Sequence, residues 1–472
     1  MKHLHLIYIK EEGQRPDNMI GKQARIMKKK ARFILQCAQH EVSLHAKIYI
    51  KRAMRVLIVN TSECTGGAAV AAKRLTQALI NNGVKAKMLV CEKQTDALYV
   101  ASCGPLLRIM RHFVWERFVI WATNLFSRRN LFEVSIANAG EDITRTSEFA
   151  EADIIHLHWT CQGMLSLSGI RKILRSGKPV VWTMHDMWPC TGICHHAHEC
   201  NRYEEACGEC RFLRFPGKKD LSHRVFERKR RIYSEGRLAF VAVSTWLAKR
   251  AAASALLQGR QVATIPNSLS LEKFRLSDRT DMRSLLHLSA KHVIAFGAAR
   301  IDAPIKGFSY LKQALSLLVR EKGYAPNDIH LLLFGNVKDA HTLDDISVPY
   351  THLGLVRDES TLSQIYSASD VLVSSSLYET FGQTIIEAQA CGCLPVSFDN
   401  SGQTDIISHR RNGYLARYLS PEDLAEGIDW CLHAHIDRHE LRKIVLGRYS
   451  ESKIAQQYIA LYHQILKQQL PQ

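Results

Sequence analysis

The stretch of sequence that decides the fold is Val371-Leu-Val-Ser-Ser-Ser-Leu-Tyr-Glu379-Thr-Phe-Gly-Gln-Thr-Ile-Ile-Glu387-Ala-Gln-Ala-Cys-Gly392. Its first four residues predict a buried strand, the run from Ser374 to Gly382 predicts a loop, and the residues up to Cys391 predict a helix that stops at Gly392. Residues 394–398 predict the next strand. A strand, loop, helix and strand in this order form the repeating unit of a parallel α/β sheet.

The junction between this loop and helix has the features of a phosphate-binding site. Free backbone N–H groups at Phe381, Gly382 and Gln383 and the positive end of the helix dipole favour a phosphate group. Glu379 lies in the loop and Glu387 lies about one and a half turns into the helix, so the two carboxylates can bind different parts of one extended ligand. The alternative is that both are solvated acids beside an ordinary helix.

Three further blocks accompany this one: Phe296-Gly-Ala-Ala-Arg300-Ile-Asp-Ala-Pro-Ile-Lys306-Gly307, Ile265-Pro-Asn267-Ser, and Ser401-Gly-Gln-Thr-Asp405-Ile-Ile followed by Asn412-Gly-Tyr-Leu. Together with residues 374–396 they resemble the family 4 retaining glycosyltransferases, notably the bacterial enzymes of polysaccharide and colanic-acid-type biosynthesis. The resemblance extends over roughly residues 54–472. The sequence departs from the family pattern at Ser268, where Gly is usual, and at Asp405, where Glu is frequent.

The resemblance implies a donor-binding set. Breaking a sugar–phosphate bond requires stabilisation of the leaving diphosphate, and Arg300 and Lys306 supply a fork-shaped and a point cation for that task. An ordinary surface basic pair is the alternative. By resemblance, Glu379 binds hydroxyls of the donor sugar and Glu387 contacts the ribose. The complete expected set is Gly66, Gly67, Asn267, Arg300, Lys306, Glu379, Phe381, Gly382, Gln383 and Glu387.

The N-terminal half contains two candidate blocks. The strand Arg55-Val-Leu-Ile-Val-Asn60 precedes Gly66 and Gly67, a weak signal alone because every doubly wound domain has such a loop. The strand Val180-Val-Trp-Thr-Met184 precedes His185 and Asp186 directly, at the strand end where α/β proteins bind ligands. By resemblance, His185 contacts the donor sugar and Asp186 orients it, while a core or turn-capping pair is the alternative.

A further predicted strand, Asp153-Ile-Ile-His156-Leu-His158-Trp159, ends in polar and aromatic residues. They are expected on the acceptor side of the site. Because His156 and His158 alternate with apolar residues, the alternative is that one of the two is a hydrogen-bonded core histidine.

No residue stands out as a covalent nucleophile, and no Asp-x-Asp pattern indicates a catalytic metal. The expected enzyme is therefore metal-independent and needs no catalytic cofactor, and its catalytic residues are His185, Asp186, Glu379, Arg300 and Lys306. The expected donor is a UDP- or GDP-linked sugar, and the expected acceptor is a glycan or lipid-linked glycan of a surface polysaccharide. The alternatives are another GT-B enzyme, such as a nucleotide-sugar epimerase or a phosphorylase, and a non-catalytic glycan- or membrane-binding protein.

Five of the thirteen cysteines fall between Cys190 and Cys210. Four of them, Cys194, Cys200, Cys207 and Cys210, have the spacing Cys-x5-Cys-x6-Cys-x2-Cys. Four soft ligands at short spacing predict a structural zinc site, while two disulfides or four free thiols remain open.

The length of 472 residues suits two α/β domains. The expected organisation is the GT-B fold, in which two Rossmann-like domains face each other across a cleft. Four segments are predicted. Residues 1–53 form a basic extension, interpreted as not native or as a targeting or membrane-binding arm. They are followed by an acceptor domain over 54–264 with a Cys-rich insert at 190–210, a donor domain over 265–447, and a helical segment over 448–472 that returns to the first domain.

The chain has a formal net charge of +18, of which the first 53 residues contribute +8. Residues 106–126 predict a basic, aromatic, amphipathic helix, which either rests on an anionic membrane or buries Phe113, Trp115 and Trp121 in the core. No zinc-finger, RNP or helix-turn-helix pattern accompanies the charge, so nucleic acid is not an expected partner. The expected location is the cytoplasm, with peripheral contact at the inner face of the cytoplasmic membrane left open.

Overall fold

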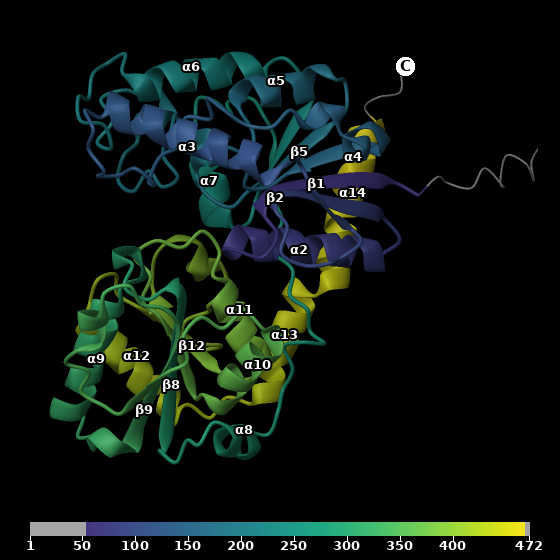
Figure 1. The fold of residues 1–472 in the computed structure, drawn as a ribbon. Coiled ribbons are helices and arrows are strands. Elements are labelled where there is room, and N and C mark those ends of the chain that lie inside the picture. The colour runs from purple at the N-terminus through teal and green to yellow at the C-terminus, as the bar shows by residue number, and fades with distance from the viewer. Residues whose placement is uncertain (1–52, 468–472) are drawn as a thin grey trace, which may run out of the picture. The chain divides into compact units, whose positions relative to one another are not determined.

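The computed structural model describes residues 53–467 of the chain (Figure 1). These residues form two separate parallel sheets with helices around each, so the predicted α/β class with two Rossmann-like units is confirmed. The predicted extension lies outside the described residues except for Ala53, as do the last five residues of the predicted C-terminal segment.

The N-terminal sheet has seven strands in the order β3-β2-β1-β4-β5-β6-β7, all paired in parallel. The strand order reverses at β1, which has β2 on one side and β4 on the other. The strands are β1 (Arg55–Ser62), β2 (Lys85–Glu92), β3 (Val100–Ser102), β4 (Ile154–Leu157), β5 (Val180–Met184), β6 (Leu238–Ala242) and β7 (Val262–Thr264).

The C-terminal sheet has six strands in the order β10-β9-β8-β11-β12-β13, again all parallel. Here the order reverses at β8, between β9 and β11. The strands are β8 (His292–Arg300), β9 (Ile329–Asn336), β10 (Tyr350–His352), β11 (Val371–Ser374), β12 (Leu394–Phe398) and β13 (Tyr414–Ala416).

The helices connect these strands, as parallel sheets require. They are α2 (Gly67–Asn81), α3 (Leu106–Thr123), α4 (Ser147–Glu151), α5 (Leu167–Arg175), α6 (Leu221–Tyr233), α7 (Thr245–Ala253), α8 (Arg279–Leu285), α9 (Phe308–Arg320), α10 (Glu359–Ala368), α11 (Gln383–Ala390), α12 (Pro421–His433), α13 (Arg438–Tyr449) and α14 (Glu451–Lys467).

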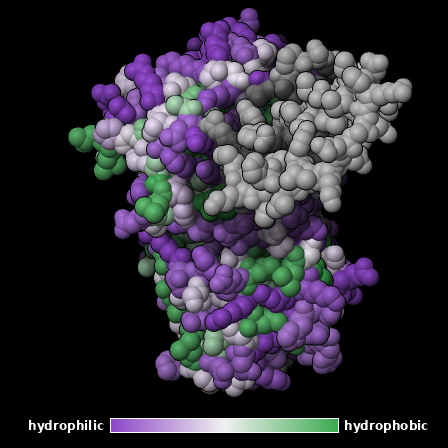
Figure 2. Space-filling view, turned by 90° about the vertical axis from the view of Figure 1, so that its right-hand side faces the viewer, coloured by the Kyte–Doolittle hydropathy of each residue, from purple (hydrophilic) through white to green (hydrophobic). Residues whose placement is uncertain are grey.

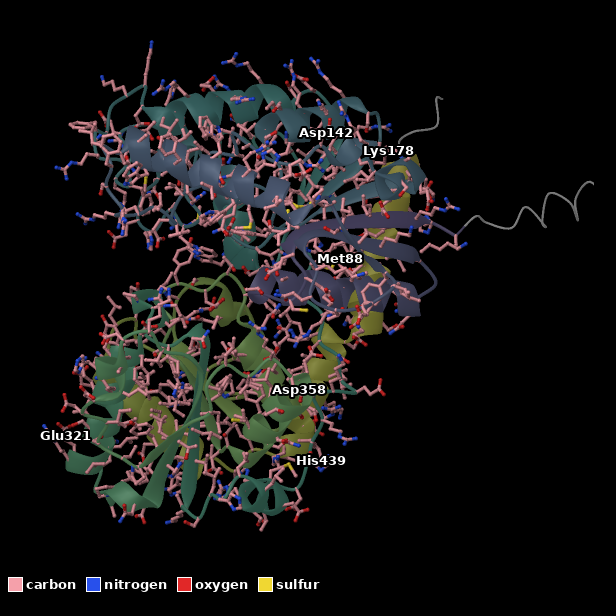
Figure 3. The ribbon with its side chains drawn as sticks, viewed as in Figure 1. Met88, Asp142, Lys178, Glu321, Asp358 and His439 are labelled. Carbon is pink, nitrogen blue, oxygen red and sulfur yellow. The ribbon has the colours of Figure 1, made fainter. Side chains whose placement is uncertain are left out.

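Side chains satisfy the backbone at many helix ends. At the start of α10, Asp358 accepts a hydrogen bond from the backbone N–H of Thr361 at 2.8 Å (Figure 3). At the end of α4, Lys178 donates to the carbonyl oxygens of Phe149 and Ala150 at 2.8 and 2.9 Å (Figure 3). An N-terminal acceptor and a C-terminal cation both complement the helix dipole.

The central strands are apolar because helices cover both of their faces. In β11, Val371, Leu372 and Val373 are at most 1% exposed. The predicted bounds of β11 and β12 are correct to the residue. The helix predicted between these two strands is α11, and its predicted length is one residue too long, because Cys391 is the C-cap of α11.

The last two helices contact different sheets (Figure 1). Helix α13 packs against α11, and α14 packs against α2. From α14, the Tyr458 hydroxyl lies 2.9 Å from Thr183 Oγ1 and the Tyr462 hydroxyl lies 2.6 Å from His156 Nδ1. The chain thus returns to the N-terminal sheet after completing the C-terminal one, while the predicted domain boundaries stay a prediction.

The predicted amphipathic helix forms as α3 and ends at Thr123. Its buried side holds Ile109 and Ile120, and Glu116, whose carboxylate accepts hydrogen bonds from two backbone N–H groups. The interpretation that Trp115 is buried in the core is wrong, since that side chain is 53% exposed, whereas Phe113 and Trp121 are half-buried.

The surface in Figure 2 is mostly hydrophilic, with hydrophobic residues in small groups. Among residues 53–467, no helix has the length and apolarity needed to cross a bilayer.

Candidate active site

The predicted site residues lie at the carboxyl ends of strands, next to the points where the two strand orders reverse. In the N-terminal sheet, β1 leads to Gly66 and Gly67, and β4 leads to His158. In the C-terminal sheet, β8 ends at Arg300 and β11 leads to Glu379. Open α/β sheets bind ligands at such switch points, because adjacent loops there diverge and leave room.

Two of the predicted blocks contact each other. The Thr380 hydroxyl, next to Glu379, donates to the backbone carbonyl of His185 at 2.8 Å. The Tyr378 hydroxyl lies 2.9 Å from Met187 Sδ. The loop after β5 and the loop after β11 are therefore neighbours, although almost two hundred residues separate them in the sequence.

The amino ends of two helices also meet. Gln383 Nε2, at the start of α11, donates to the carbonyl of Gly67, at the start of α2, at 3.2 Å. Gly66 has a φ of +91°, and a Cβ at either Gly66 or Gly67 would meet nothing within 4 Å, so the space beside this glycine pair is open. Two helix amino ends beside open space favour an anion.

The predicted cations have different partners. Lys306 Nζ lies 2.9 Å from Glu379 Oε2, and both side chains remain partly exposed. Arg300 instead pairs with Asp302 at 3.1 Å. Gly307, which follows Lys306, has a φ of +65°, and a Cβ there would lie 2.0 Å from the carbonyl oxygen of Ser375. Glycine at this position thus lets the Lys306 loop approach the end of β11.

Glu387 is buried with a partner on each oxygen. Its Oε1 accepts from Arg74 of α2 at 2.7 Å, and its Oε2 accepts from the Tyr366 hydroxyl at 3.0 Å. Arg74 also donates to Glu359 at 2.8 Å. Burial by itself would lower the pKa of Arg74, but the charges of Glu387 and Glu359 outweigh it and raise that pKa. A ribose contact at Glu387 would therefore require one of its oxygens to exchange partners.

His185 is held by another histidine. Its Nε2 lies 2.8 Å from Nδ1 of His158. Burial lowers the pKa of His185 to about 4, against a smaller opposing effect of Asp186, so the ring is neutral at neutral pH. A neutral imidazole can donate one hydrogen bond and accept another.

Asp186 is bonded to other partners than predicted. Its Oδ2 lies 2.7 Å from His195 Nδ1 and accepts from Trp159 Nε1 at 2.7 Å, and its Oδ1 accepts from the backbone N–H of Trp188 at 2.8 Å. Burial opposes ionisation of this carboxyl group, but His195, His196 and the backbone N–H of Trp188 together outweigh burial and lower its pKa to about 2. The hydrogen bonds given for Asp186 do not include His185, whose own hydrogen bond is with His158, and the orienting role of Asp186 stays a prediction.

The structure also places three further residues that the sequence singled out. Asn267 is buried in the segment that follows β7. Asp405, from the fourth sequence block, accepts from the backbone N–H and the hydroxyl of Thr245, both at 2.5 Å. His156 is the hydrogen-bonded core histidine that the sequence left open, because its two ring nitrogens contact Tyr462 and Thr183.

The sequence did not single out Arg74, Tyr366, Glu359 or His195 as site residues, and it placed Trp159 only within a block expected on the acceptor side. The available signal for His195 was its place among the clustered cysteines and histidines after Asp186. Arg74 and Tyr366 carried no signal, since an arginine and a tyrosine on amphipathic helices are ordinary residues until the tertiary structure brings them to Glu387.

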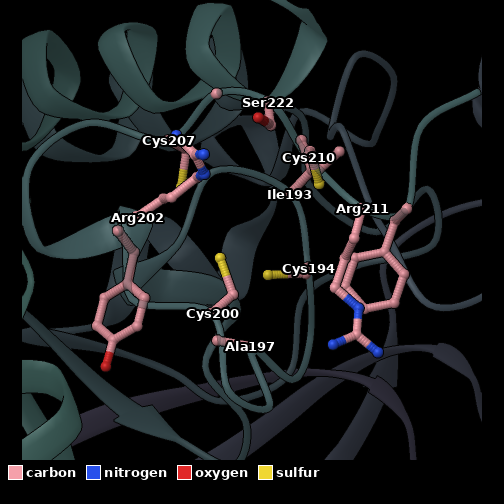
Figure 4. Close-up of a pocket in the computed structure, with 12 residues that line it drawn as sticks. Ile193, Cys194, Ala197, Cys200, Arg202, Cys207, Cys210, Arg211 and Ser222 are labelled. Atoms are coloured by element: carbon pink, nitrogen blue, oxygen red, sulfur yellow. The ribbon is translucent and has the colours of Figure 1, made fainter. Parts of the chain in front are cut away.

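The four clustered cysteines line one small cavity (Figure 4). In this structure Cys194, Cys200, Cys207 and Cys210 are free thiols and do not form the two disulfides that the sequence left open. The segment that carries them is the one that contains Trp188 and His195, the partners of Asp186.

Two family descriptions match the chain. "Glycosyltransferase Family 4" matches residues 65–273, and "Glycosyl transferases group 1" matches residues 290–434. The capsular polysaccharide biosynthesis glycosyltransferase CapM of Staphylococcus aureus is 22% identical over 240 residues, which cover 48% of this chain and 62% of CapM. The chain spans about half the length of the curated relatives it matches.

Solved structures share the fold. Sucrose-phosphate synthase from Thermosynechococcus elongatus has a TM-score of 0.60 and 19% identity, covering 88% of this chain and 99% of that one. HepE from Anabaena, in complex with UDP-glucose, has a TM-score of 0.56 and 15% identity, covering 87% of this chain and 100% of HepE. At these identities the likeness establishes the fold, which is GT-B as predicted.

Proposed function

Since the chain belongs to the family 4 glycosyltransferases, we propose that it transfers a sugar from a nucleotide sugar to a glycan or lipid-linked glycan, with retention of anomeric configuration. The observation that carries this proposal is the meeting of the amino ends of α2 and α11 through Gln383 and Gly67. Two helix dipoles and an open glycine pair offer a diphosphate its hydrogen-bond donors without a metal ion. Lys306 and Glu379 lie in loops that reach the same region.

The proposed step needs no covalent intermediate. The bond between the anomeric carbon and the phosphate oxygen breaks, and its electron pair leaves with the nucleoside diphosphate. The acceptor oxygen forms the new bond on the same face, and its proton passes to the leaving phosphate. Lys306, assisted by Arg300 and the helix ends, stabilises the developing negative charge, and stabilisation of this kind usually contributes more to catalysis than any other effect.

His185 and Glu379 would position the sugar rather than exchange protons. The depressed pKa of His185 keeps it neutral, which suits a hydrogen bond to a sugar hydroxyl. Glu379 faces Lys306, so its carboxylate can bind a sugar hydroxyl while the ammonium group addresses the phosphate. Glu387 remains the proposed ribose contact, provided that Arg74 or Tyr366 releases one oxygen on binding.

The relatives support the choice of substrates. CapM bears a name that refers to capsular polysaccharide biosynthesis, and HepE was solved with UDP-glucose. We therefore expect a UDP-linked donor before a GDP-linked one, and a surface-polysaccharide intermediate as the acceptor.

The experiment that tests this proposal combines ligand binding with turnover. A thermal-shift screen would compare the full chain with the variants Glu379→Ala and Glu321→Ala, and its ligands would be UDP, GDP, ADP and their sugar conjugates. Glu321→Ala is the control, because Glu321 is an exposed glutamate just beyond α9 (Figure 3). A ligand at about 100 times its Kd stabilises a protein by about 2.7 kcal/mol, a readily measured shift. We expect one nucleotide class to stabilise all three proteins, and Glu379→Ala to lose only the increment due to the sugar.

Turnover separates the alternatives. Acceptor-dependent release of the nucleoside diphosphate supports transfer, whereas acceptor-independent change of the donor sugar would indicate an epimerase. Absence of a shift with every nucleotide, in a folded protein, would overturn the proposal in favour of a binding protein.

We also propose that α3 and the segment after it contact an anionic membrane. Nine of their large apolar side chains are exposed to solvent, and exposed arginines at positions 111, 128 and 129 provide positive charge. Aromatic and basic residues on one exposed face are typical of proteins that bind the interface of an anionic bilayer. The exposed apolar residues are Leu106, Leu107, Met110, Val114, Trp115, Phe118, Leu125, Phe126 and Phe132.

This contact predicts a defect in vesicle binding for the double variant Trp115→Ser/Phe118→Ser. Burying a side chain of this size contributes about 1.5–3 kcal/mol, so the double variant should bind vesicles at least about tenfold more weakly. Co-flotation of the full chain with phosphatidylglycerol-containing and pure phosphatidylcholine vesicles provides the measurement. Leu98→Ser is the matched control, because Leu98 is 99% exposed outside α3. Undiminished binding by the double variant would assign the contact to another surface.

A further inference from the structure

We propose that Cys194, Cys200, Cys207 and Cys210 together bind one Zn²⁺ ion that holds the segment 187–220 in its fold. This site is separate from the proposed transfer reaction. Nothing in the reaction requires a metal, and the test below has a readout that does not depend on activity.

The four thiols belong to the wall of one small cavity. Its volume is about 20 Å³, and the sulfurs of all four cysteines are directed toward it from different sides (Figure 4). A cavity of this size holds about one water molecule, so a nucleotide or a sugar is excluded. Its other walls are largely apolar, formed by Ile193, Ala197, Tyr203 and Phe212 among others.

The chemistry of this lining selects a soft metal ion. Four cysteine sulfurs in tetrahedral arrangement are typical of structural zinc, at Zn–S distances of about 2.3 Å. No histidine is among the residues that line the cavity, and His195 is bonded to Asp186. A four-cysteine set is therefore favoured over a mixed set of cysteine and histidine.

A buried lysine provides an independent observation. Lys229 is fully buried in α6, and its ammonium group donates to the carbonyl oxygens of Trp188 and Thr191 at 2.6 and 3.0 Å. A buried cation is costly without a negative charge nearby. Cys161, Cys207, Cys190 and Cys194 lie within electrostatic range of this ammonium group, and two of these cysteines, Cys207 and Cys194, line the cavity. Four thiolates around Zn²⁺ carry a net charge of −2, which would supply the missing counter-charge.

The ligands must move inward to coordinate the metal. Among residues 53–467, no three His, Cys, Asp or Glu side chains already have the geometry of a metal site. The cysteines belong to a segment whose only regular elements before α6 are two short 3-10 turns, so small loop and rotamer changes can close the cavity around an ion. Loss of four thiol protons accompanies binding, as at other zinc–thiolate sites.

The zinc site would position residues of the candidate active site without touching the substrate. Cys194 is adjacent to His195, which holds Asp186, and the same segment presents His196 to Tyr378. Metal binding would add a cross-link to the packing of this segment, whose residues Trp188, Tyr203 and Phe212 are already buried in the core.

Metal analysis of the full chain tests the proposal. Protein purified under reducing conditions without added chelator is expected to contain one zinc ion per chain, measured by mass spectrometry of the metal. Cys200→Ser and Cys210→Ser should lose nearly all of it. Cys190→Ala is the matched control, since Cys190 is buried in the same segment, outside the cavity lining, and should keep its zinc.

A second measurement covers the case in which the variants fail to fold. Co²⁺ added to chelator-stripped wild-type protein should give the intense thiolate-to-metal and tetrahedral d–d absorption of a four-sulfur site, which added Zn²⁺ abolishes. The proposal would be overturned if the wild-type protein contained no zinc and gave no Co²⁺ spectrum although the four cysteines were present as reduced thiols. Zinc-free protein in which the four thiols are absent before reduction would overturn it in favour of two disulfides.

Discussion

Lys306→Ala is expected to lower kcat for sugar transfer by about 10²–10³-fold, the loss found when one preorganised donor to a developing negative charge is removed. Lys306 stands in the loop after β8 and faces Glu379 at 2.9 Å. Charge on the leaving diphosphate grows toward the transition state, so the loss should fall on kcat more than on the KM for the acceptor. Initial rates of nucleoside diphosphate release at saturating donor provide the measurement.

Two further variants make this result specific. Lys306→Arg keeps the charge but changes its shape, and we expect partial recovery of kcat. Lys312→Ala removes a partly exposed lysine of α9 that donates to the carbonyl of Asp344, and it should leave kcat unchanged. A wild-type kcat in Lys306→Ala, with the protein folded, would contradict the assigned role. Stability should change little, because the Lys306–Glu379 pair is partly exposed.

Arg74→Ala is expected to destabilise the protein by about 3–5 kcal/mol, the usual result of removing one partner of a buried ion pair. The side chain of Arg74 is 3% exposed, and that of Glu387 is 6% exposed. Without Arg74, the Glu387 carboxylate would keep the Tyr366 hydroxyl as its hydrogen-bond partner and lose its opposite charge. A lower midpoint in a urea titration, followed by tryptophan fluorescence, provides the measurement.

The double variant Arg74→Leu/Glu387→Leu distinguishes ion pairing from packing. Replacing both members of a buried pair by apolar residues is often nearly neutral, so the double variant should be more stable than Arg74→Ala. Equal losses in both proteins would mean that the arginine contributes through its contacts with Phe274 and other neighbours rather than through its charge.

The local pattern of the chain was sufficient to predict much of the fold. The apolar run before Ser374, the glycine that ends α11 and the next apolar run predicted two strands and a helix almost to the residue. The catalytic expectations at Glu379, Lys306, His185 and Asp186 came from a family resemblance, and their roles remain proposals. Their placement at strand ends followed from the βαβ pattern, because polar residues after buried strands emerge at one edge of a parallel sheet.

The partners of these residues could not be predicted in the same way. Arg74 reaches Glu387 across more than three hundred residues, and Thr380 reaches the carbonyl of His185 across almost two hundred. His185 makes its hydrogen bond with His158, because the ends of β4 and β5 are neighbours in the sheet. A single sequence carries no signal for such pairs, since each member is an ordinary residue in its own element.

By itself, then, the sequence determined the two parallel sheets, the positions of the candidate residues after their strands, and the cluster of four cysteines in one segment. These features depend on periodicity and spacing, which are local properties of the chain. Only the tertiary structure decided that α2 and α11 meet at their amino ends, that Glu387 pairs with Arg74, and that the four sulfurs line one cavity. Those contacts depend on how the elements pack, because burial and close approach arise only after distant segments of the chain come together.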